Sequence, residues 1–397
     1  MTLNELLNRL NIKEAPEKLY ALYDEMDKSD DGSTYDLKSI KALNDKYGML
    51  GEFSEIIYSQ AVEFAKHPDL ILYARACAEY IKSCTTSVEA RLVMIPLSDG
   101  SAALDVFPTL LLLSVMPDAV RLYRARGFSE EEIGVNLRNL RINLGVLLRR
   151  TGRPYLDQGH FNWMCHYVKA YIFDHKSFNF QPFKFGADVI YLKNKSGDFV
   201  PMMTAGRIDR DGLILGTVGH TDEAGAFDVN FYETDEEFVG NLVHNSRVDK
   251  EVTALKKSEW ECVLKKGDYV VNLHIPDGTD LSPEAVGISL REGLELSKKY
   301  YPELNLDKIV CSSWLLDEKL CELLGEGAKI TSFVNLFLKY PILSYGTSCL
   351  GYVFTGYQSG PVEDFPENTT LQRKIKALML GGEYILGAGG LITYLIK

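Results

Sequence analysis

The sequence lacks several features that would assign it to a well-defined class of protein. No two of its seven cysteines form a CxxC pair and their number is odd, which favours reduced thiols over disulfides or a zinc site. The longest apolar run, 108–116, has about half of the roughly 20 residues that span a bilayer, and Pro117 follows it. We therefore expect this run to be a buried helix or strand that ends at the proline, and most cysteines to be small core residues.

Basic residues are also outnumbered by acidic ones. The 397 residues include 43 Lys and Arg against 55 Asp and Glu, a formal net charge of −12. Nucleic acids and anionic membranes are bound through a basic surface that displaces counterions, so we expect neither as a partner. The first 20 residues are charged throughout and lack the apolar core of a signal peptide, and the sequence therefore predicts a cytoplasmic protein.

Motifs of the common hydrolases and metal enzymes are missing as well. We find no GxSxG, HExxH, P-loop or EF-hand pattern, and the seven histidines are scattered, so we expect no serine hydrolase and no metal site. No repeat with a period of 20 to 50 residues occurs. The 46% hydrophobic and 25% charged residues are those of an ordinary folded protein, long enough for two or three domains.

The first part of the chain has a helical texture. Apolar residues recur every three or four positions, which predicts an all-helical N-terminal domain over 1–175. Ser129 and Glu132 have the spacing of a capping box and predict a helix that runs to about Arg150 and ends at Gly152. Residues 121–153 hold eight arginines and no lysine, a pattern typical either of a solvated helix face or of an anion site.

The texture changes over 176–397, which we expect to form an α/β C-terminal domain. Short aromatic and β-branched runs separated by Gly, Asp and Asn predict antiparallel strands over 178–185, 187–192, 197–203, 212–219 and 226–233. A strand over 269–275, a helix over 282–300 and a strand over 308–315 then predict a βαβ unit. The remaining predicted elements are a helical stretch over 317–338, a strand over 344–354, a helix over 370–380, a turn over 387–390 and a strand over 390–396. The fold class is therefore α+β, a helical domain followed by a mixed β-sheet flanked by helices.

Polar side chains follow the two strands of the βαβ unit at the points where they end. His274 ends the first strand, and Ser312, Ser313 and Trp314 end the second. Adjacent parallel strands would place these side chains in one cleft, where ligands commonly bind. His274 could act as a general base or bind a ligand, or it could simply bond a neighbouring backbone group.

Several strings in this half resemble a known family. VVNLHIPDG, IVCSSWLLDEKLCELL and AKITSFVNLF, in this order, are similar to the C-terminal half of bacterial acyltransferase-domain proteins. That half is GNAT-like, meaning similar to the GNAT N-acetyltransferases, and the family has a helical N-terminal domain. LYRARGFSEEEI and FNFQPFKFG upstream also resemble the family, so the likeness extends from about residue 120 to the end.

The resemblance implies where an acyl-CoA would bind. The strands ending near His274 and Trp314 would separate to admit its pantetheine, and the helix beginning at Ser282 would face its pyrophosphate. The cofactor-binding residues implied in this way are Ile275, Gly278, Ser282, Ser313 and Trp314. The resemblance thus implies acetyl-CoA or another acyl-CoA as a cosubstrate, with no tightly bound cofactor. The Q/R-x-x-G-x-G/A loop of ordinary GNAT enzymes is replaced here by PDGTDL, and acidic residues lie around the helix start.

Two functions follow from these expectations. The first is an acyl-CoA-dependent N-acyltransferase that acylates an amine, with His274 as the base, Ser312 bonding substrate or pantetheine, and Tyr340 as the acid for the leaving thiolate. The second is a catalytically silent GNAT-like binding module for a small metabolite or a protein partner. The sequence further suggests a small-molecule substrate, and a homodimer that would pair through aromatic strands within 178–232.

Overall fold

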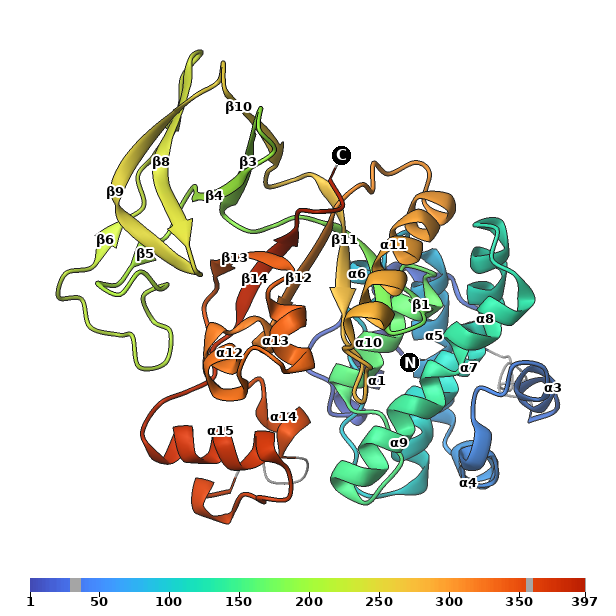
Figure 1. Ribbon diagram of the computed structural model, residues 1–397. Helices are drawn as coiled ribbons and strands as arrows, with labels where there is room; N and C mark the ends of the chain where they lie inside the picture. Colours follow the sequence, from blue (N-terminus) through green and yellow to red (C-terminus); the bar gives the residue numbers. More distant parts are fainter. Residues whose placement is uncertain (29–36, 355–359, 397) are drawn as a thin grey trace. The chain divides into compact units, whose positions relative to one another are not determined.

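The computed structural model describes residues 1–28, 37–354 and 360–396. They form two compact units, Met1–Phe173 and Asp174–Lys397, which divide two residues before the predicted boundary. Helices make up the first unit, and the strands begin with β1 (Phe173–His175) and continue through the second (Figure 1). The α+β class with a helical first part is thus confirmed.

The helical unit contains the segments in which the periodicity is strongest. Predicted helices over 3–10, 19–26, 56–64 and 70–81 correspond to α1, α2, α4 and α5. The helices of this unit are α1 (Leu3–Arg9), α2 (Glu17–Glu25), α3 (Leu37–Tyr47), α4 (Ser54–Phe64), α5 (Pro68–Ser83), α6 (Ser87–Ala90), α7 (Ala102–Ala125), α8 (Glu130–Leu137), α9 (Asn139–Thr151) and α10 (Gln158–Val168).

The longest apolar run lies in α7, at the centre of this unit. Our expectation that Pro117 ends it is wrong, because α7 continues through both Pro108 and Pro117. Helices α4, α5 and α10 pack around α7, and this tertiary packing outweighs the local cost of the prolines. Among the described residues α7 is the one helix long and apolar enough to cross a membrane, and 78% of its most apolar window is buried, as in the core helix of a folded domain.

The capping box at Ser129 is confirmed. The Ser129 hydroxyl accepts from the Glu132 amide, and the Glu132 carboxylate accepts from the Ser129 amide. The single helix predicted from there to Arg150 is wrong, since α8 and α9 meet at Arg138. At this junction the Asn139 side chain donates to the carbonyl of Asn136, and side-chain bonds of this kind compete with the helical ladder.

The arginine-rich stretch is used at least in part for ion pairs within the helical unit. Arg124 Nε lies 2.6 Å from a Glu130 carboxylate oxygen. Arg153 pairs with the buried Asp105. These contacts correspond to the first of the two interpretations of the stretch, a helix face that pairs its charges locally, more closely than to an open anion site.

A six-stranded mixed sheet forms the centre of the second unit. Its order is β1, β2 (Phe178–Lys184), β11 (Tyr269–His274), β12 (Ile309–Ser313), β14 (Ala388–Ile392) and β13 (Phe337–Pro341). Strands β11 and β12 are parallel and are joined by α11 (Pro283–Tyr300), which confirms the predicted βαβ unit. The registers of β2 with β11, β12 with β14 and β13 with β14 are antiparallel.

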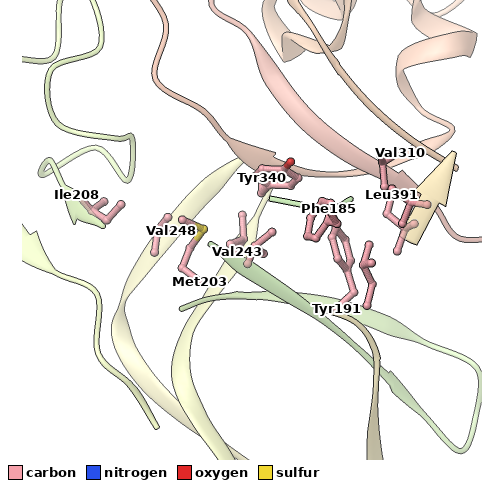
Figure 2. Packing of buried hydrophobic residues seen from close by; sticks show 12 residues of the cluster. Phe185, Tyr191, Met203, Ile208, Val243, Val248, Val310, Tyr340 and Leu391 are labelled. Carbon is pink, nitrogen blue, oxygen red and sulfur yellow. The ribbon is translucent and has the colours of Figure 1, made fainter. Parts of the chain in front are cut away.

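The two faces of this sheet are covered differently. On one face α11 packs over β2, and the Phe178 ring packs against that of Phe333 in α13 (Lys329–Val334), with 5.8 Å between the ring centroids. A second sheet packs on one end of the other face through a buried apolar cluster that includes Tyr191, Val310 and Leu391 (Figure 2). The strands of the second sheet are β10 (Trp260–Leu264), β3 (Val189–Asn194), β4 (Phe199–Met203), β8 (Glu237–His244) and β7 (Phe231–Glu233), with β9 (Arg247–Lys256) paired to β8.

Some predicted strands are replaced by other structure. The segment 212–219 is a loop held by isolated bridges, and it lies between two short strands, β5 (Arg207–Ile208) and β6 (Phe227–Asp228). The predicted strand 344–354 contains a short helix, α14 (Leu350–Val353). The helical stretch 317–338 is broken into α12 (Glu318–Leu324) and α13, and it ends in β13. The helix 370–380 is confirmed as α15 (Thr370–Leu380).

The β8–β9 hairpin was not predicted. Its turn consists of Asn245 and Ser246, both at positive φ, 48° and 60°. Two residues in this conformation match the twist of a tight hairpin, and Asn tolerates it best after glycine. Serine at the second position hides the turn from a search for Asn-Gly or Asp-Gly, and so the longest strand pair of the unit escaped detection.

Candidate functional site

The β-ladder between β11 and β12 is short. The register pairs Val271 with Ile309 and Asn272 with Val310. Beyond these residues no further β11–β12 pair exists in the described structure, although β11 continues to pair with β2 and β12 with β14. The two parallel strands therefore end with edges that do not bond to each other. We call residues 273–275 and 311–314 the open strand ends.

Polar residues occupy one face of the sheet beside the open strand ends. Asn272 and His274 are two residues apart in β11 and therefore point to the same face of the sheet. Gln181 of β2 lies directly opposite Asn272. His274 Nε2 lies 2.8 Å from Oε1 of Gln181 and 3.2 Å from Nδ2 of Asn272. An amide oxygen only accepts, so the contact with Gln181 requires the proton on Nε2. His274 thus donates to the side-chain amide of Gln181, and that of Asn272 lies beside the same nitrogen.

Burial lowers the pKa of His274 to about 4. The imidazole is consequently neutral at pH 7, because partial removal from water disfavours its charged form. A neutral imidazole has a nitrogen that can accept a proton, but a pKa this low makes it a weak base. The role of His274 as the base stays a prediction.

The two serines at the end of β12 have different environments. Ser312 is exposed and lies on the same sheet face as His274, whereas the neighbouring Cys311 is buried on the other face. The hydroxyl of Ser313 accepts from the Leu315 amide at 3.1 Å and caps the 3-10 turn η3 (Trp314–Leu316). Ser312 is therefore available to a ligand, and Ser313 has a structural use at the end of the strand.

Tyr340 lies on the same face, with two strands, β12 and β14, between its strand and that of His274. It pairs with Gly389, which in turn pairs with Ser312, so the three residues form a row across the sheet. The ring lies over Gly389, where an added Cβ would come within 2.1 Å of Cζ, and this close approach explains the glycine. The predicted turn over 387–390 is therefore wrong, since Ala388, Gly389 and Gly390 are strand residues.

The Tyr340 hydroxyl is a potential hydrogen-bond donor to a ligand. It makes no hydrogen bond to any of the described residues, although the side chain is 7% exposed and packs against Phe185 and Tyr191 (Figure 2). Burial raises the pKa of Tyr340 well above its usual value, so the phenol keeps its proton at all physiological pH values. A protonated phenol without a partner can donate to a ligand.

The loop from β11 to α11 is fixed by local bonds. Gly278 has φ +74° in the turn, and Thr279 Oγ1 donates to the carbonyl of Pro276 at 2.6 Å. The Ser282 hydroxyl donates to Asp280 instead of capping the helix, and Lys329 Nζ lies 2.8 Å from the same carboxylate. These contacts hold the pKa of Asp280 down to about 2. The first amides of α11 are thus left without a side-chain cap.

Apolar residues continue both open strand ends. Ile275 after β11 and Trp314 after β12 pack against one cluster formed by α12, α14 and α15. Trp314 also lies 6.2 Å from the exposed ring of Tyr352. A small cavity of about 80 Å³ borders the first turn of α11 and the helix α13. The open strand ends are therefore flanked by apolar surface as well as by polar groups.

Sequence reasoning missed polar residues that the fold brings to this region. Gln181 and Asn272 belong to no recognisable sequence motif. Only the register of β2 on β11 shows that they lie beside His274. Asp209 and His220 also form a hydrogen-bonded pair, on either side of the segment 212–219 that had been predicted as a strand. The spacing of Asp209, Asp211 and His220 in the sequence does not predict a contact between them. Only the closed conformation of the loop brings the side chains of Asp209 and His220 together.

The aromatic strands that we expected at a dimer edge differ in their exposure. Phe178, Phe180 and Phe185 are buried in the second unit. Strand β7 is at a sheet edge and exposes Tyr232 at 50%. All seven cysteines are free and five are buried, as expected for small core residues.

Comparison with known proteins identifies part of the chain. Residues 215–392 match the profile of the GNAT-like C-terminal domain. No curated protein sequence matches the chain. Three crystal structures are similar over 99% of this chain and 99% of their own: an acyltransferase with decanoyl-CoA (15% identity, TM-score 0.66), an acyltransferase mutant with octanoyl-CoA (16%, 0.64), and an acyltransferase with decanoyl-CoA and teicoplanin (15%, 0.61). The chain therefore has the fold of these acyltransferases.

Proposed function

Because residues 215–392 belong to the GNAT-like C-terminal domain family, we propose that the chain is an acyl-CoA-dependent N-acyltransferase that acylates an amine of a small molecule. The observation that most supports this proposal is the short ladder between β11 and β12, which ends after Asn272 and Val310. The similar crystal structures hold acyl-CoA, and one of them also holds teicoplanin, which is consistent with an acyl-CoA donor and a small-molecule acceptor.

The open strand ends suit the pantetheine arm of an acyl-CoA. Where two parallel strands stop pairing, their facing amides and carbonyls need other hydrogen-bond partners. Pantetheine has two amide groups and can add to a strand edge in the way that an extended peptide does. Ile275 and Trp314 then offer apolar contact on either side, and Ser313 helps to fix the end of β12.

The start of α11 can receive the pyrophosphate. Free amides and the helix dipole favour negative charge there. Acidic residues near this helix start oppose such a site, because they would repel a phosphate. The structure reduces that objection, because Lys329 pairs with Asp280 and the Ser282 hydroxyl is directed to the same carboxylate. Gly278 and Ser282 would lie along the path from pantetheine to phosphate.

The row formed by Ser312, Gly389 and Tyr340 places polar groups on the face where a thioester would lie. Ser312 would bond the substrate or the pantetheine. Tyr340 would give a proton to the thiolate of CoA as it leaves, since its hydroxyl is protonated and has no partner in the described structure. The role of His274 as the base stays a prediction from the sequence, and its low pKa makes it a weak base.

A second candidate function keeps the fold without the reaction. The PDGTDL loop lacks the glycine pattern of ordinary GNAT enzymes, and the Nε2 proton of His274 is donated to Gln181. A GNAT-like binding module for a metabolite or a protein would show both features.

Titration of the purified chain with CoA, acetyl-CoA and longer acyl-CoAs separates the two candidates. A ligand that binds only the folded state raises its stability, so thermal shift and calorimetry both report binding. We expect micromolar affinity for at least one acyl-CoA, followed by release of free CoA thiol when a suitable amine is added. Absence of binding at millimolar concentration of every acyl-CoA would contradict the acyltransferase and favour the binding module.

A further inference from the structure

A second histidine has the geometry of an activated base. His220 Nδ1 lies 2.7 Å from Oδ2 of Asp209, and the Asp209 carboxyl is almost fully buried, whereas the His220 side chain is 23% exposed. A carboxylate that accepts from Nδ1 fixes the tautomer in which Nε2 is unprotonated. Nε2 has no hydrogen-bond partner among the described residues, so one nitrogen of a correctly oriented imidazole is left for a ligand.

Backbone amides of its own loop hold the Asp209 carboxyl in place. Its Oδ1 accepts from the amides of Asp211 at 3.0 Å and Leu213 at 2.8 Å. Gly212, at φ +82°, packs so closely on β9 that an added Cβ would lie 2.9 Å from the backbone of Val248. Both oxygens of Asp209 are therefore used, one to shape the turn and the other to orient His220.

Backbone bonds attach the His220 loop to the end of the central sheet. The amide of Val218 donates to the carbonyl of Ser344 at 2.9 Å. The Ser344 hydroxyl accepts from the amide of Gly387 at 3.0 Å, directly before β14. Residues 342–346 follow β13, and β13 and β14 carry Tyr340 and Gly389. The Asp209–His220 pair is thus tied to the strands that carry Tyr340.

We propose that His220 is the general base of the acyl transfer and that Asp209 is its positioning residue. This inference rests on the proposed function. His220 Nε2 takes a proton from the acceptor amine while the amine nitrogen bonds to the thioester carbonyl carbon. The carbon–sulfur bond then breaks, the thiolate of CoA takes the proton of Tyr340, and the His220 proton returns to the tyrosinate through water. The products are an amide and free CoA.

His220 is better suited to this role than His274. Contact with Gln181 requires the proton on Nε2 of His274, and Asn272 lies beside the same nitrogen. His220 instead has its Nδ1 engaged by a carboxylate, which stabilises the imidazolium that forms when Nε2 accepts a proton. His274 then contributes to the polar lining of the open strand ends.

The test compares His220→Gln, Asp209→Asn and a control, His244→Gln. His244 forms an exposed pair with Asp249 at 3.3 Å in the same unit, so its replacement removes a similar pair away from the loop. Each full-length protein is assayed for acyl-CoA binding by calorimetry and for release of CoA thiol with a panel of primary amines and with water alone. We expect His220→Gln to lower turnover at least a hundredfold, Asp209→Asn at least tenfold, and His244→Gln less than twofold, all with unchanged acyl-CoA affinity.

Nitrogen-15 NMR of the imidazole rings gives a readout that does not depend on turnover. We expect the Nδ1–H tautomer for His220, lost in Asp209→Asn. Normal turnover of His220→Gln, or an Nε2–H tautomer in the unaltered protein, would overturn the assignment. So would loss of activity on chelation and its recovery with zinc, because Asp209, Asp211 and His220 would then be holding an ion. If the unaltered protein binds no acyl-CoA, the proposed function fails first, and this inference fails with it.

Discussion

The two ends of one sheet face have opposite chemistry. At one end Val310 and Leu391 are buried beneath the second sheet. At the other end His274 and Ser312 are polar and lie beside the point where β11 and β12 stop pairing. The apolar end fixes the strands, whereas at the open end β11 and β12 no longer pair with each other and keep only their outer partners, β2 and β14. Each end can be perturbed separately.

Replacement of Leu391 by alanine tests the apolar end and has the largest expected effect. Leu391 is fully buried, and truncation of such a side chain costs about 2–5 kcal/mol through lost burial and a cavity. Urea unfolding of the full chain measures the loss. Leu380→Ala is the control, because Leu380 is 54% exposed and its truncation should change stability by less than about 0.5 kcal/mol. Equal effects would show that the apolar cluster does not hold the sheet.

The polar end should make stability depend on pH. The pKa of His274 is about 4 in the folded chain and near 6.5 when unfolded, so the unfolded state binds more protons between these values. Stability should therefore rise with pH from about 4 to 6.5, by no more than about 3 kcal/mol from this residue. Urea unfolding at several pH values should show a smaller dependence for His274→Gln. An unchanged dependence would mean that the imidazole is not desolvated.

Gly389 connects the two ends, and its replacement should disturb both. An alanine Cβ would overlap the Tyr340 ring, and forced overpacking of this kind typically costs about 1–3 kcal/mol. Because the ring must move, transfer activity should fall as well. Gly327→Ala is a matched control, since nothing lies within 4 Å of its added Cβ. If Gly389→Ala and Gly327→Ala behaved alike, Tyr340 would not depend on this glycine.

Ser312→Ala has the smallest expected effect on stability. The residue is exposed, so the change in unfolding free energy should be within about 0.5 kcal/mol. Its loss should nevertheless weaken acyl-CoA binding or turnover several-fold, because a ligand hydrogen bond is removed. Calorimetry and the thiol-release assay measure the two quantities. Unchanged values of both would remove Ser312 from the site.

The sequence predicts the parts of this site that follow from the succession of helices and strands along the chain. The βαβ unit follows from the apolar pattern of 269–275 and 308–315 and the helix between them, and the family strings point to the same region. His274 and Ser312 were found in this way because both end a predicted strand. Local pattern and short-range order were sufficient here.

Other parts depend on contacts between distant residues and could not be predicted. Gln181 meets His274 through strand register, and Lys329 meets Asp280 across 49 positions of sequence. The strand pattern of 212–219 was misleading, because its glycines and buried apolar residues form a closed loop instead. His220 becomes a candidate base only because this loop closes and brings it to Asp209, which is eleven residues earlier in the chain.

Hydrogen exchange in the presence of decanoyl-CoA tests the central claim most directly, because it shows where a ligand binds as well as whether it does. We predict slower amide exchange in peptides that cover 273–275 and 311–314 and the first turn of α11, with no change in the β8–β9 hairpin. Calorimetric binding of decanoyl-CoA without protection of these segments would contradict the claim that the open strand ends hold the acyl donor.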